Sequence, residues 1–127
     1  MTRRWASALS AIGMLLTATS VLAHHDWPVN RTVQVTLQGT VTAFTWANPH
    51  VTIAFVVEVD GTSEKWIAGG SSPKVMGDGG WEKTTLNAGD VITVTGYPFR
   101  NGSNVLQLQK VVMASGRELY YGARPRL

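Results

Sequence analysis

The chain has 127 residues, a formal net charge of +3 and no cysteine. This length fits one domain, and without cysteine that domain must be held together by its hydrophobic core rather than by disulfides. The small net charge, with no basic stripe along the chain, argues against a nucleic-acid partner.

The first 23 residues have the three parts of an export signal. Arg3 and Arg4 give a positive start, an apolar run of about 15 residues follows, and Val21 and Ala23 stand three residues and one residue before a cleavage site. The apolar run is shorter than the roughly 20 residues that a membrane-spanning helix needs. We therefore predict a signal peptide over residues 1–23, removed after Sec export to the periplasm. The alternative is an uncleaved N-terminal anchor.

Cleavage after Ala23 would leave residues 24–127 as a single domain with no integral membrane segment. Because Arg3 and Arg4 are removed, nine basic residues remain against eight acidic ones, a net charge of +1. The mature protein is therefore expected to be close to neutral.

Apolar and polar residues alternate from Val33 to Ala43, the period of a half-buried strand. The bulky residues then change parity, to Phe44 and Trp46, and Gly39 stands where a glycine commonly marks a bend or bulge. We predict one long first strand that bends at Gly39 and changes face, as a small closed barrel requires.

Further strands and one short helix follow along the chain. Asp60-Gly61 and residues 100–103 have the composition of hairpin turns. Ser72 before Pro73 is typical of a helix start, and Gly77 of a helix end. The predicted strands cover residues 51–59, 64–68, 91–97, 105–113 and, as a short terminal strand, 118–121.

This order predicts an all-β fold, a small OB-like barrel of five to six strands with a short helix between strands 3 and 4. The oligonucleotide/oligosaccharide-binding (OB) barrel has five strands, and the helix position matches it. A β-sandwich is the alternative fold.

Several short motifs occur in an order that resembles a known family. They are the histidine pair at positions 24 and 25, Asn48-Pro49-His50, Gly80-Trp81, the run from Leu86 to Val91, and Gly96-Tyr97-Pro98. Together they resemble a family of small exported bacterial proteins of unknown function and, more loosely, periplasmic OB-fold proteins linked to stress tolerance. The resemblance implies a compartment and an OB-like fold, and no established activity, substrate or cofactor.

His24 and His25 would begin the mature protein. A terminal amine, with a pKa of about 7.7–8.0, can lose its proton near neutral pH and bind a metal. The amine and imidazole of His24 would together chelate Cu(II), which suits nitrogen-rich sites. In an alternative ligand set, His25 binds with the amine and the intervening backbone nitrogen. The other interpretation is a solvated terminus without a metal.

His50 is the third histidine of the chain. Because Pro49 fixes its own φ and biases Asn48 toward an extended conformation, the pair should form a turn that aims His50 at the head of a strand. His50 could then close a metal site, with Asp26 as a further ligand or as the carboxylate that orients an imidazole. The structural alternative is a hydrogen bond from His50 to a neighbouring loop.

Trp27, Trp46, Trp66 and Trp81 are many tryptophans for a domain of this size. Exposed aromatic rings can stack on bases or sugars, yet tryptophan more often packs in or at the rim of a core. We expect such packing for most of the four. Trp27 and Asn48 are the predicted ligand-lining residues.

No paired carboxylates, no nucleophile with its base and no zinc-ligand cluster stand out, so we predict no enzymatic activity. The favoured function is that of an exported binding protein with Cu(II) as its candidate ligand. The alternative is an envelope protein-interaction or assembly module without a metal. A third reading is a copper monooxygenase built on His24.

Overall fold

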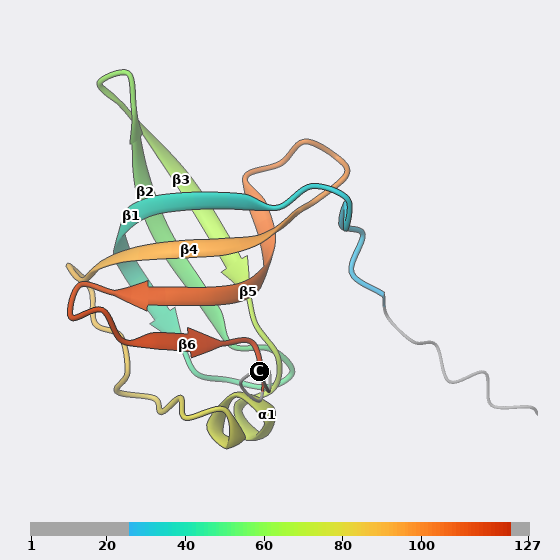
Figure 1. Cartoon of the computed structure of the whole chain (residues 1–127), viewed down its shortest axis with the longest axis vertical. Helices are drawn as coiled ribbons and strands as arrows, with labels where there is room; N and C mark the ends of the chain where they lie inside the picture. Colours follow the sequence, from blue (N-terminus) through green and yellow to red (C-terminus); the bar gives the residue numbers. More distant parts are fainter. Residues whose placement is uncertain (1–25, 123–127) are drawn as a thin grey trace, which may run out of the picture.

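The computed structural model describes residues 26–122, which form strands and one short helix (Figure 1). The fold is all-β, as predicted. No helix in this part of the chain has the length and apolar character needed to cross a bilayer. The elements are β1 (Val35–Thr45), β2 (Thr52–Val59), β3 (Thr62–Gly69), α1 (Pro73–Asp78), β4 (Val91–Pro98), β5 (Val105–Met113) and β6 (Glu118–Tyr120).

Five of the strands close into a barrel. Their order is β3-β2-β1-β4-β5, and a parallel pairing of β3 with β5 over residues 67–69 joins the two ends. β6 is an extra strand, antiparallel to β5. This topology, with α1 between β3 and β4, confirms the predicted OB-like barrel rather than the β-sandwich.

β1 pairs with β4 along its first half and with β2 along its second. Its change of face occurs at a bulge between Val41 and Ala43, where the register with β2 shifts. The bulge does not lie at Gly39, which stays in regular register with β4. A Cβ at Gly39 would stand 2.6 Å from the carbonyl oxygen of Val56, so this glycine permits a close approach of two strands.

The apolar positions of β2 show how the alternation builds the core. Val51, Ile53, Phe55 and Val57 are all buried, as predicted. Val59 has the same parity but is 40% exposed, because β1 pairs with β2 only as far as Val56. Beyond this point β2 and β3 form a hairpin that projects from the barrel (Figure 1), and β3 begins two residues earlier than predicted.

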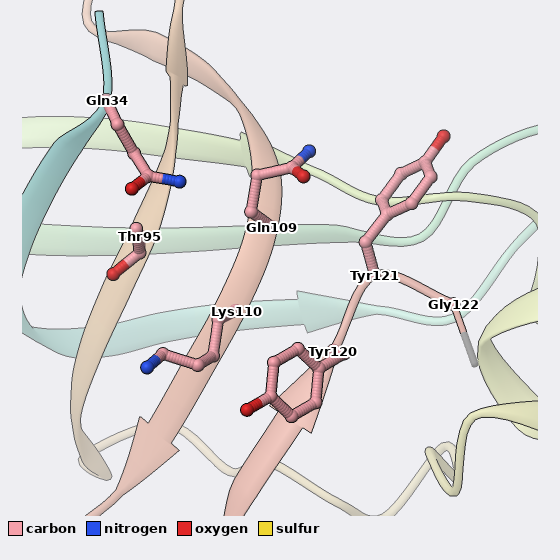
Figure 2. A pocket seen from close by; sticks show the side chains of 7 residues that line it. All are labelled: Gln34, Thr95, Gln109, Lys110, Tyr120, Tyr121 and Gly122. Atoms are coloured by element: carbon pink, nitrogen blue, oxygen red, sulfur yellow. The ribbon is translucent and has the colours of Figure 1, made fainter. Parts of the chain in front are cut away.

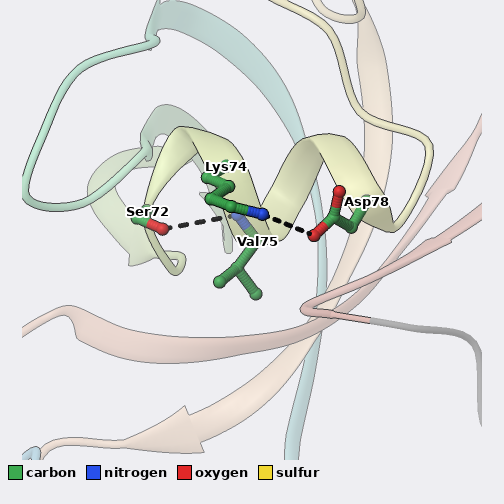
Figure 3. A network of polar contacts seen from close by, with 4 residues as sticks. All are labelled: Ser72, Lys74, Val75 and Asp78. Carbon is green, nitrogen blue, oxygen red and sulfur yellow. Dashed lines mark hydrogen bonds and ion pairs between the residues drawn. The ribbon is translucent and has the colours of Figure 1, made fainter.

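α1 lies across one end of the barrel (Figure 1). Its start is the predicted one: the hydroxyl of Ser72 accepts a hydrogen bond from the backbone N–H of Val75 at 3.3 Å (Figure 3), which satisfies a donor at the open helix end. Met76 is fully buried, and Trp81, in the following loop, is 2% exposed. The indole N–H of Trp81 donates to the carbonyl of Tyr120 at 2.8 Å, so this loop is tied to β6.

Candidate functional site

The segment before β1 is fixed against the connection between β4 and β5. Val29 forms an isolated antiparallel bridge with Phe99 and has no exposed surface. The N–H of Asn30 donates to the carbonyl of Pro98 at 2.9 Å, and a second bond of 2.9 Å joins the same two segments on the other side of the bridge. The start of the described chain is therefore held on the barrel although it belongs to none of the six strands.

His50 is placed beside the end of β3 by its neighbour Val51. The N–H of Val51 donates to the carbonyl of Ser71 at 2.8 Å, and its carbonyl accepts from the N–H of Gly70 at 2.7 Å. The peptide bond before Pro49 is cis, and the His50 side chain is exposed. His50 thus lies on the surface where β2 begins and β3 ends.

Trp27 connects these two anchored segments. Its ring centroid lies 4.9 Å from that of His50 and 5.9 Å from that of Phe99, and both pairs meet edge to face. The indole rests on Gly69, where any Cβ would overlap it. Such aromatic contacts contribute about 0.5–1.5 kcal/mol beyond the burial of area. Together the contacts hold the partly buried Trp27 ring beside His50.

Asp26, Trp27, Pro28 and His50 line one shallow pocket of about 250 Å³. Asp26 and His50 are exposed there, so the pocket offers an accessible carboxylate and an accessible imidazole next to an indole ring. A carboxylate beside an imidazole can bind a divalent metal or orient a metal-bound ring. The structure brings three of the predicted site residues into one pocket.

The remaining predicted site residues are placed differently. His24 and His25 lie outside the described residues, and Asn48 is exposed but does not line this pocket. Within residues 26–122, no group of three or more histidine, cysteine, aspartate or glutamate side chains could hold a metal ion. In this pocket the described residues supply two such side chains, Asp26 and His50.

The sequence matches the family of unknown function DUF6152 over residues 12–107. The chain belongs to this family. The match to DUF6152 covers every predicted site residue from His24 to His50 and extends to the first residues of β5. No curated protein matches the chain. Because DUF6152 has no assigned function, the function must be argued from the geometry of the site.

Three residues of this DUF6152 protein lie near Trp27 but were not predicted as part of the site. Phe99 and Gly69 contact Trp27 directly. Gln107 pairs in register with Gly69, which places its side chain on the sheet face that Trp27 covers. Gln107 is 5% exposed, and its Oε1 has no hydrogen-bond partner within the described residues. No local sequence signal marks these three, because they are brought together by the pairing of β3 with β5 and by the bridge between Val29 and Phe99.

The other three tryptophans of the described residues pack in or against the core, as expected. Trp81 belongs to the buried core, and Trp46 and Trp66 are partly buried against it. Trp27 lines a pocket together with a carboxylate, Asp26, and an imidazole, His50. It is therefore the aromatic residue around which we build the functional argument.

Proposed function

We propose that this protein is exported and that its small β-barrel binds one Cu(II) ion at the amino terminus created by signal-peptide cleavage. The contact between Trp27 and His50 supports this most directly. It places the chain just after the predicted cleavage site beside the third histidine. We further propose that the function is binding and not catalysis.

Covalent geometry limits how far the proposed ligands can lie from His50. Two residues span about 7 Å when fully extended, so the backbone of His24 stays within roughly that distance of Asp26. Asp26 and His50 line the same pocket. The amine and ring of His24 are therefore within reach of a metal held by His50 at the usual metal–nitrogen distance of about 2 Å.

Each proposed ligand has a separate task. The amine and imidazole of His24 form a chelate, and His50 supplies a third nitrogen, a donor set that Cu(II) favours. Asp26 either completes the site or orients an imidazole through a hydrogen bond. His25, with the amine and the backbone nitrogen between them, is the alternative chelate. Trp27 stabilises the position of His50, so that metal binding would cost less conformational entropy.

The test is a Cu(II) titration, followed by electron paramagnetic resonance, of protein that has been exported and processed in a cell. Intact mass would confirm that the chain begins at His24. We expect one tightly bound equivalent with nitrogen hyperfine structure. An alanine added before His24 should weaken binding on the order of 100-fold, because the amine no longer forms a chelate with that ring.

Histidine variants then separate the ligand sets. His50→Ala should remove one nitrogen from the spectrum, and Asn48→Ala, in the same turn but outside the pocket, serves as its control and should change nothing. If His25→Ala abolishes binding while His24→Ala does not, the alternative chelate is correct. Weak binding of several equivalents, or unchanged affinity after the added alanine, would show that no terminal copper site exists.

A second candidate function, an envelope protein-interaction or assembly module without a metal, is favoured by an open strand edge. β3 pairs with β5 only through residues 67–69, so residues 62–66 face no strand of the described chain on that side. Ile67 is 45% exposed and lines a groove of about 410 Å³ together with Trp66. An extended segment of a partner protein could add to such an edge as a further strand.

The two candidates differ in whether they need the histidines. An interaction through the β3 edge should survive replacement of His24, His25 and His50 by alanine. It should be lost when Ile67→Lys puts a charge in the groove beside that edge. Co-purification from envelope extracts measures both. Loss of the interaction in the triple-alanine protein would contradict a separate, metal-free interface.

A further inference from the structure

A second pocket lies on the outside of the barrel, where β4, β5 and β6 pair (Figure 2). Its volume of about 470 Å³ is in the range of small-ligand sites. It shares no lining residue with the Trp27 pocket. We call it the tyrosine cleft; its side chains come from Gln34, Thr95, Gln109, Lys110, Tyr120 and Tyr121.

A β-bulge builds one part of the tyrosine cleft. The register between β4 and β5 shifts between Thr95 and Gly96, which leaves Gln109 without a ladder partner in β4. Bulges of this kind re-aim a side chain. The carbonyl of Gln109 accepts a hydrogen bond from the N–H of Tyr121 at 3.0 Å, and Figure 2 shows the Gln109 amide between Gln34 and the Tyr121 ring. The bulge thus holds an amide and an aromatic ring in the same cleft.

Within the described residues, the tyrosine cleft carries almost no net charge. Lys110 is the one charged residue among those that line it in the described chain, and its ammonium lies 3.7 Å from the carboxylate of Glu118. The hydroxyl of Tyr120 donates to that carboxylate at 2.8 Å. Because Glu118 offsets the positive charge, an anionic ligand would gain little here. The cleft therefore suits a neutral ligand.

We propose that the tyrosine cleft binds a neutral oligosaccharide. Tyrosine rings combine a flat apolar face with a polar tip, and the apolar face matches the C–H surface of a pyranose ring. The amides of Gln34 and Gln109 each donate and accept hydrogen bonds, as sugar hydroxyls require. Thr95 adds a hydroxyl, held in place by the hydroxyl of Thr36 at 3.1 Å.

The test uses the complete mature protein and three neutral trisaccharides: maltotriose, cellotriose and N,N′,N″-triacetylchitotriose. Each is added stepwise while the ¹⁵N–¹H spectrum of the protein is recorded. We expect at least one sugar to shift the backbone amides of Thr95, Lys110 and Tyr121 in a saturable way, with a Kd on the order of 1 mM or below. The amides of Trp27 and His50 should not move.

Matched variants connect the binding to the cleft. Tyr120→Ser removes a ring from the cleft and should weaken binding about 10-fold. Tyr97→Ser removes a tyrosine that lies outside the cleft, with Arg31 at 5.9 Å over its ring, and should leave the affinity unchanged. Gln34→Ala, at an exposed position, should weaken binding several-fold without a risk to folding, whereas the exposed Gln38→Ala should not.

Four outcomes would overturn the proposal. Three of them are the absence of saturable shifts with all three sugars, shifts that cluster away from the cleft, and equal weakening by a cleft variant and its control. Stronger shifts with a sulfated trisaccharide or a mononucleotide than with the neutral sugars would also overturn it, because the cleft would then recognise charge or a base. The copper proposal is unaffected by any of these results, since the two sites share no residue.

Discussion

Two tryptophans show how differently one residue type is used in two regions of this molecule. Trp81, in the loop after α1, is 2% exposed, and its indole N–H donates to the carbonyl of Tyr120. Trp27, before β1, keeps part of its ring exposed and contacts His50 and Phe99. Trp81 completes the core, whereas Trp27 shapes a surface.

The difference follows from what surrounds each ring. Trp81 packs among core side chains, with the ring of Phe44 at 6.1 Å. Trp27 rests on the outer face of the barrel at Gly69, where the absence of a side chain makes room for it. The free energy of unfolding should therefore depend strongly on Trp81, and the position of His50 should depend on Trp27 and Gly69.

Trp81→Ala should have the largest effect. Loss of a buried tryptophan lowers the free energy of unfolding by about 3–5 kcal/mol, and here it also leaves the carbonyl of Tyr120 without its donor. Urea unfolding followed by circular dichroism measures the loss. Trp81→Phe keeps most of the apolar volume but not the hydrogen bond, and should cost about 1–2 kcal/mol. Equal losses for the two variants would mean that packing contributes little at this end of the barrel.

Gly69→Ala should displace the indole of Trp27 and lower the free energy of unfolding by about 1–3 kcal/mol. The ring protons of His50 should also shift in the NMR spectrum, because Trp27 moves away from them. Gly77→Ala is the matched control: a Cβ there meets nothing within 4 Å, and alanine raises the stability of a helix by up to about 1 kcal/mol. Unchanged His50 resonances in Gly69→Ala would contradict the contact between Trp27 and this glycine.

Ser72→Ala removes the cap of α1 and should cost about 1 kcal/mol. Removal of the cap leaves the backbone hydrogen bond from Val51 to Ser71 in place, so we expect thermal stability to fall while the His50 resonances stay where they are. Ser72→Asp keeps a capping oxygen and should remain near the stability of the natural protein. A shift of the His50 signals in Ser72→Ala would show that the two regions are coupled.

Lys74→Ala should have the smallest effect. Lys74 and Asp78 form an ion pair of 3.5 Å along α1 (Figure 3), but their side chains are 85% and 71% exposed. Exposed pairs at this spacing contribute about 0.3–0.5 kcal/mol and are screened by salt. Urea unfolding at low and high salt should therefore show nearly the same stability for the variant and the natural protein. A loss above about 1 kcal/mol would give α1 a larger electrostatic role than its exposure allows.

Most elements of the fold could be predicted because they depend on residues close together in the chain. The alternation in β2, the Asp60-Gly61 turn and the Ser72-Pro73 helix start are of this kind. Gly61 has a positive φ of 78°, as a glycine in such a turn can adopt, and Asp60 also has a positive φ, 50°. The bulge of β1 lies between Val41 and Ala43 and not at Gly39. Gly39 is required because the backbone of β2 lies too close for a side chain. This contact between two strands cannot be read from the local sequence pattern.

The candidate site was predictable in part. Residue type and nearness to a predicted cleavage site singled out Asp26 and Trp27, and the turn before β2 singled out His50. Asn48 belongs to the same turn but does not line the pocket. Nothing in the sequence indicates that Phe99 contacts Trp27, since a bridge between distant segments brings them together.

The sequence by itself determined the strand pattern, the caps and turns and the residue types that can bind a ligand, because these depend on side-chain chemistry and on near neighbours. The tertiary structure decided which of those residues meet. Closure of the barrel through β3 and β5 places Gly69 beside Gln107, and the Val29 bridge carries Trp27 onto that glycine beside His50. The bulge at Gln109 likewise opens the tyrosine cleft between strands. These contacts join residues far apart in the chain, and they exist only once the barrel has closed.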